Sequence, residues 1–80
     1  MRKNENIRPS ETMNAVMQYL TEIRPLKEDG EYIPYGEIAV GIKEKLGLDR
    51  SRHAIAYAIE RLRKIGKLAI YDNKLHLVGA

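Results

Sequence analysis

The chain contains no cysteine among its 80 residues, so it can form neither a disulfide framework nor a zinc site with thiolate ligands. This absence suits a reducing compartment, and we expect a cytoplasmic protein, associated with the nucleoid if the source is bacterial or archaeal. Unbroken apolar runs extend over only a few residues, which predicts no membrane-spanning helix. The N-terminal stretch MRKNENIRPS lacks the apolar segment of a secretory signal.

The residue patterns of catalysis are also missing. There is no glycine-rich phosphate loop and no convincing Ser-His-Asp spacing, and the two histidines, His53 and His76, lie far apart without a cluster of carboxylates. We therefore predict no enzymatic activity, no metal site, no cofactor and no small-molecule ligand. A chain of this length forms one domain and buries only ~60–65 % of its unfolded surface.

Positive charge is concentrated in the C-terminal part of the chain. The formal net charge is +3; residues 1–47 carry seven Lys/Arg and eight Asp/Glu (net −1), whereas residues 48–80 carry seven Lys/Arg and three Asp/Glu (net +4). Such asymmetry suggests a polyanionic partner. A solvated basic surface without a partner would give the same counts.

Periodic apolar residues predict three helices, at about 10–24, 34–46 and 51–65. Ser10 can cap the first helix, Pro25 stops it, and Gly47 and Gly66 end the second and third. The inward-facing side chains of the helices and the following strands should form one core: Val16, Leu20, Ile38, Ile42, Leu46, Ile55, Ile59, Leu62, Leu68 and Ile70.

The last segment is predicted to be a β-hairpin turning at Asp72-Asn73, a pair that tolerates positive φ. Pairing Tyr71 with Lys74 places four apolar side chains on one face: Leu68, Ile70, Leu75 and Leu77. Residues 31–33 are β-prone and predict a further short strand, which Pro34 ends.

The stretch EIAVGIKEKLGLDRSRHAIAYAIERLRKIGKLAIY resembles the winged helix-turn-helix DNA-binding family. It has the Glu-Ile-Ala helix, the Leu-Gly-Leu turn, a recognition helix ending in Leu-x-x-x-Gly-x-Leu, and then the wing. The resemblance covers residues 10–78 and implies an α+β, mainly α, fold with three helices, a short strand and a C-terminal hairpin. Residues 1–9 would be a flexible arm and residues 10–80 a single domain.

The resemblance implies sequence-specific binding to double-stranded DNA by a small transcriptional regulator, with the third helix in the major groove. It also accounts for basic residues at a helix start, where the helix dipole favours anions. The residues implied in DNA contact are Arg50, Ser51, Arg52, His53, Ala56, Tyr57, Arg61, Lys64 and Lys74. Arg50 and Arg52 would meet phosphate or base, and a homodimer on a two-fold site would provide specificity.

The alternative is a winged helix that serves as a protein–protein interaction module in a larger assembly, without direct DNA readout. Two features favour it. The wing tip carries Asp72 beside Lys74, and Glu60 stands on the outer face of the third helix, where we expect it to pair with Lys64.

Overall fold

Three of the predicted helix boundaries are confirmed: the start of the first helix and the ends of the second and third. In the computed structural model, which describes residues 10–78, the elements are α1 (Glu11–Gln18), the π-helical η2 (Tyr19–Ile23), α2 (Tyr35–Leu46), α3 (Arg52–Lys64), β1 (Leu68–Tyr71) and β2 (Lys74–Leu77). The Ser10 hydroxyl accepts a hydrogen bond from the Met13 backbone N–H at 3.1 Å, which caps α1. Gly47 and Gly66 follow α2 and α3 with φ of 71° and 81°, a backbone conformation that glycine adopts without strain.

The first helix changes character in its second half. The sequence predicts one α-helix as far as Arg24, but the α-helical hydrogen bonding ends at Gln18 and a π-helical turn continues to Ile23. Gly41 on the facing helix α2 leaves room for Tyr19, because a Cβ at Gly41 would lie 2.1 Å from the Tyr19 Oη atom. The Tyr19 ring thus lies directly against α2, and it can do so because residue 41 has no side chain.

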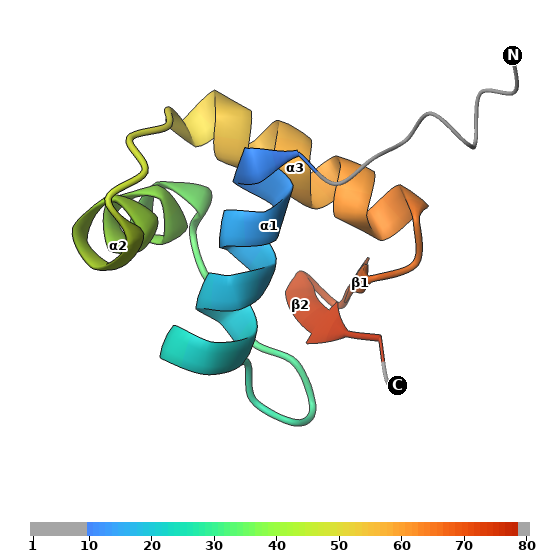
Figure 1. Cartoon of the computed structure of the whole chain (residues 1–80). Helices are drawn as coiled ribbons and strands as arrows, with labels where there is room; N and C mark the ends of the chain where they lie inside the picture. Colours follow the sequence, from blue (N-terminus) through green and yellow to red (C-terminus); the bar gives the residue numbers. More distant parts are fainter. Residues whose placement is uncertain (1–9, 79–80) are drawn as a thin grey trace, which may run out of the picture.

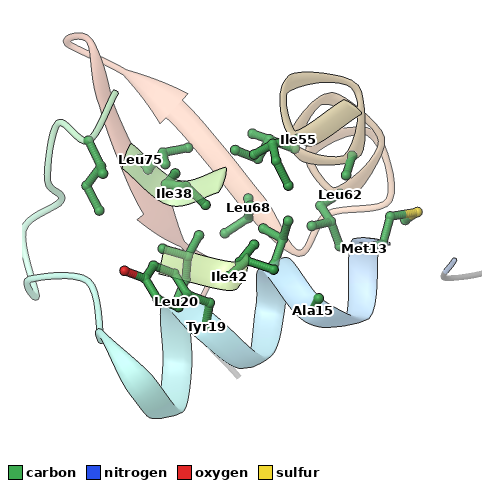
Figure 2. Close-up of a cluster of buried hydrophobic side chains, with 14 of the residues drawn as sticks. Met13, Ala15, Tyr19, Leu20, Ile38, Ile42, Ile55, Leu62, Leu68 and Leu75 are labelled. Atoms are coloured by element: carbon green, nitrogen blue, oxygen red, sulfur yellow. The ribbon is translucent and has the colours of Figure 1, made fainter. Parts of the chain in front are cut away.

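The core lies between the three helices and the hairpin (Figure 2). Its largest fully buried side chains are Met13, Val16, Leu20, Ile38, Ile42, Ile55, Ile59, Leu62 and Leu68. Two predicted core members lie at its edge instead. Leu46 is half-buried in the last turn of α2, and Ile70 is 38 % exposed in the hairpin.

The hairpin register is confirmed. Tyr71 pairs with Lys74 and Ile70 with Leu75, and the turn residues Asp72 and Asn73 have φ of 56° and 59°. Only two of the four apolar side chains on the shared face are buried. Leu68 and Leu75 are buried, whereas Ile70 and Leu77 are 38 % and 39 % exposed. Two-stranded ribbons twist strongly, so only two diagonally placed side chains of this face, Leu68 and Leu75, reach the core.

The predicted short strand at 31–33 is reduced to a single bridge. Glu31 and Leu75 exchange two backbone hydrogen bonds of 3.0 and 2.9 Å, and within the described part of the chain no other residue of this segment pairs with a strand. Ile33 turns into the core, where it is 3 % exposed, and Pro34 starts α2 immediately afterwards. The segment has no room to extend its pairing.

The result is a mainly helical α+β fold with the layout of a winged helix-turn-helix domain (Figure 1). α1 and α2 both pack on α3, and the antiparallel hairpin follows directly after α3. Among residues 10–78, no helix is both long enough and apolar enough to cross a bilayer.

Candidate nucleic-acid interface

α3 starts at a well-defined cap. The Ser51 hydroxyl accepts a hydrogen bond from the Ala54 backbone N–H at 3.1 Å, which satisfies one of the free donors of the first turn. The predicted site residue Ser51 therefore has a structural role. Arg52 and His53, both exposed, occupy the first turn, which contains no acidic residue.

α3 divides cleanly into a buried face and an outer face. Its buried residues are Ile55, Ala58, Ile59 and Leu62. The outer face carries exposed His53, Tyr57 and Lys64, with Tyr57 64 % exposed. Ala56, Arg61 and Glu60 are half-buried along the margins of this face. Of the predicted site residues on α3, His53, Tyr57 and Lys64 thus share one exposed face, with Ala56 and Arg61 at its margins.

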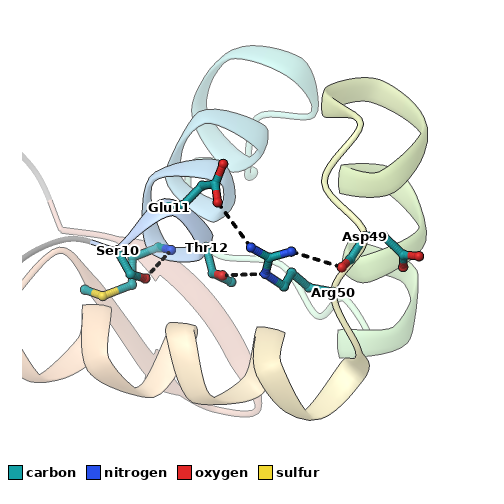
Figure 3. Close-up of polar contacts among 6 residues, drawn as sticks. Ser10, Glu11, Thr12, Asp49 and Arg50 are labelled. Carbon is teal, nitrogen blue, oxygen red and sulfur yellow. Dashed lines mark hydrogen bonds and ion pairs between the residues drawn. The ribbon is translucent and has the colours of Figure 1, made fainter.

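Arg50 does not share that surface. Its Nε donates to Thr12 Oγ1 and its Nη2 to Glu11 Oε1, both at 3.1 Å, so the guanidinium group points toward α1 (Figure 3). Its Nη1 donates to the carbonyl oxygen of Asp49, also at 3.1 Å. Arg50 therefore ties the turn before α3 to the start of α1, and Glu11 balances its charge. The prediction that it faces outward with the recognition residues is not supported by this geometry.

Tyr57 and Arg61 form a pair on the outer face. Arg61 Nη1 donates to the Tyr57 hydroxyl oxygen at 3.1 Å, and the guanidinium carbon lies 5.5 Å from the centre of the tyrosine ring. This distance is within the range of a cation–π contact. Both side chains border a shallow groove of about 370 Å³ between α3 and the N-terminal end of α1. The pair joins an aromatic hydroxyl to a permanent positive charge.

Glu60 is neutralised locally, although by a different partner from the expected one. It pairs with Arg63, one turn along α3, and not with Lys64. The hydrogen bond from Arg63 lowers the pKa of the Glu60 carboxyl and raises the pKa of Arg63. The planar guanidinium can bind both carboxylate oxygens, which explains why arginine is preferred over lysine here.

The first turn of α2 lies near both the start of α3 and the hairpin tip. Arg52 Cδ lies 3.7 Å from the position that a Cβ on Gly36 would occupy. On the other side of this turn, Tyr35 and Lys74 border the same hollow of about 270 Å³. Lys74 is exposed at the start of β2, next to Asp72 and Asn73. Arg52 and the predicted wing contact Lys74 thus each lie near the first turn of α2.

Sequence reasoning missed the α1 residues that hold Arg50. Glu11 and Thr12 were assigned no role, because a contact between residues 11–12 and 50 leaves no local pattern in the sequence. It also missed the hollow that Tyr32 and Pro34 form with Ile70 of the hairpin.

No protein-family model, curated protein or solved structure gives a significant match to this chain. The reading of the site therefore depends on its geometry and chemistry.

Proposed function

We propose that the protein binds double-stranded DNA sequence-specifically, as a small transcriptional regulator in the cytoplasm, with the outer face of α3 in the major groove. The proposal includes no catalytic activity. A major groove admits one α-helix, and the recognition helix of a helix-turn-helix protein contacts bases through its N-terminal residues. Arg52, His53, Ala56 and Tyr57 stand at these positions of α3.

The observation that carries the proposal is the composition of the outer face of α3. The helix contains four Lys/Arg and one Glu, and that Glu is paired with Arg63. The surface therefore offers several cations and one compensated anion. Such a face attracts a polyanion, because each neutralised phosphate releases condensed counterions.

Arg52 and Lys64 take the phosphate contacts in this proposal, together with Lys74 on the wing. Arg50 acts indirectly, because its hydrogen bonds to Glu11 and Thr12 fix the turn before α3. A helix that enters a groove must be fixed in orientation, since recognition geometry tolerates only small errors. Arg50 therefore supports the interface without touching DNA.

The test is titration of the isotope-labelled protein with random-sequence duplex DNA at several salt concentrations. We expect the largest chemical-shift changes in residues 51–57 and a linear fall of log affinity with log salt. Arg52→Ala should reduce the magnitude of that slope by about one. Lys27→Ala removes an exposed lysine from the loop before α2 and serves as the matched control with an unchanged slope.

One observation favours the interaction-module alternative. The hairpin and its C-terminal end expose four large apolar side chains: Ile70, Tyr71, Leu77 and Val78. Exposed apolar surface of this kind often marks a protein contact. If the parent protein shows no salt-dependent binding to duplex DNA, the proposal is wrong and this alternative takes its place.

A further inference from the structure

The hydroxyl group of Tyr57 is a directed hydrogen-bond donor. Its oxygen already accepts a hydrogen bond of 3.1 Å from Arg61. Within residues 10–78, no acceptor takes up the hydroxyl's own proton. A hydroxyl group that accepts from a cation becomes a better donor, because linked hydrogen bonds polarise one another. Tyr57, 64 % exposed, therefore presents a strengthened O–H group to solvent.

The groups around Tyr57 are donors as well. Arg61 keeps N–H groups beyond the one that binds Tyr57, and guanidinium groups have no acceptor. Farther along α3 on either side of Tyr57, Arg52 and Lys64 also bring donors only. Glu60 is the acceptor that could have bound an amino group of a base, but it pairs with Arg63. The Tyr57–Arg61 pair is thus matched to hydrogen-bond acceptors, whereas His53, one turn before Tyr57, can donate or accept.

The four base pairs differ in what they offer such a surface. In the major groove guanine presents two adjacent acceptors, O6 and N7. Adenine presents one acceptor beside its N6 amino donor, thymine presents the single acceptor O4 beside its methyl group, and cytosine presents its N4 amino donor. An amino donor facing the Tyr57–Arg61 pair would leave buried donors unsatisfied on both sides, which is the costly case.

Resting on the proposed DNA-binding function, we propose that the Tyr57–Arg61 pair reads guanine, with the Tyr57 hydroxyl donating to one acceptor of the base and Arg61 to the other. Arg61 thereby has two roles. It polarises the tyrosine hydroxyl, and its cation above the ring holds the phenol in one orientation. Each recognised site then contains a guanine at the position that faces Tyr57.

The test begins with selection of bound sequences from a random duplex pool by the parent protein. We expect a guanine at one constant position of the selected site. Replacing that G·C pair by A·T should weaken binding by the parent about 5- to 150-fold, the equivalent of the usual 1–3 kcal/mol for a bidentate contact. Replacing the guanine by 7-deazaguanine, which lacks only the N7 acceptor, should weaken it by a smaller factor.

Tyr57→Phe is the diagnostic variant, because it keeps the aromatic ring beneath Arg61 and removes only the hydroxyl. It should reduce the parent's preference for the G·C site over the A·T site about fivefold, the loss of one hydrogen bond, while the Arg61 contact remains. Its salt slope should equal that of the parent, since no phosphate contact changes. Tyr32→Phe is the matched control: Tyr32 is 67 % exposed on the segment before α2, and its variant should discriminate like the parent. Equal melting temperatures would show that neither variant disturbs the fold.

The outcomes separate the two proposals. Salt-dependent binding without a constant guanine, or a Tyr57→Phe variant that discriminates as the parent does, overturns guanine readout and leaves DNA binding intact. Absence of any salt-dependent duplex binding overturns the proposed function, and guanine readout with it.

Discussion

At the scale of single residues, the ion pair between Arg24 and Glu31 joins the end of η2 to the segment that meets the hairpin. Arg24 Nη2 lies 2.8 Å from Glu31 Oε2, and the Lys27 backbone N–H donates to Glu31 Oε1 at 3.3 Å. The hydrogen bond from Arg24 lowers the pKa of the Glu31 carboxyl below its ordinary value of 4.5. Glu31 is also the residue that bridges to Leu75. Glu31 therefore holds the loop through its carboxylate and the hairpin through its backbone.

We expect Glu31→Gln to lower the free energy of unfolding at neutral pH by roughly 0.5–1 kcal/mol, the upper range for exposed ion pairs. The pH dependence has a definite sign. The pKa of Glu31 is lower in the folded state, so its contribution is complete above the ordinary value of 4.5 and is lost as the pH falls through the folded pKa. Urea unfolding of parent and variant from about pH 7 down to about pH 3 should show their difference shrinking.

Glu28→Gln is the control for this prediction, since Glu28 is an exposed carboxylate in the same loop. Its unfolding free energy should follow the parent at every pH. A gap between parent and Glu31→Gln that stays constant as the pH falls would contradict the role given to the ionised carboxylate.

At the scale of elements, the hairpin turn is specified by backbone conformation more than by packing. Asp72 and Asn73 both have positive φ, which matches the right-handed twist of the flanking strands. Both turn residues are exposed, and Tyr71 and Lys74 on either side are exposed as well. Few contacts hold the turn, so its residue types decide its stability.

Asn73→Val should therefore destabilise the protein by roughly 1–2 kcal/mol, because a β-branched side chain is strained in the left-handed region. Asn73→Gly should be neutral within about 0.5 kcal/mol, since Asp-Gly is a preferred pair for this turn. Chemical denaturation of both variants measures the difference. Equal stabilities for valine and glycine would show that residue 73 does not adopt the left-handed conformation.

The elements also show which features a sequence can predict. The cap of the first helix, the ends of α2 and α3 and the hairpin register depend on residues close together in the chain, and Ser10, Gly47, Gly66 and the Asp72-Asn73 turn were sufficient to locate them. The burial of Ile70 and the direction of Arg50 depend on segments distant in the sequence. The choice of Arg63 over Lys64 by Glu60 depends on rotamers. On α3, periodicity identified the outer face but could not reveal the Tyr57–Arg61 contact.

At the scale of the whole molecule, one apolar surface is suited to self-association. Half-buried Met17 and Ile65 and exposed Leu77 and Val78 surround a hollow of about 570 Å³ where α1, α3 and the end of β2 meet. A dimer through this surface would bring two copies of α3 into one assembly. Helix-turn-helix dimers recognise half-sites about one helical turn apart.

We expect sedimentation equilibrium to show a dimer at micromolar protein concentration and Met17→Lys to dissociate it, because a charge at an apolar interface must be desolvated. Gln18→Lys introduces the same charge at an exposed neighbouring position of α1 and should leave the dimer intact. A protein that stays monomeric both free and on DNA would rule out this mode of association.

The hairpin tip described above has a consequence for evolutionary change. All five residues from Ile70 to Lys74 are exposed, and the buried anchors of the hairpin, Leu68 and Leu75, lie behind them. Residues inserted between Asp72 and Asn73 would therefore lengthen the tip without altering the core, at an entropic cost that grows only slowly with loop length. The hairpin tip is therefore the part of this domain that can change in length while α3 and the residues packed against it stay the same.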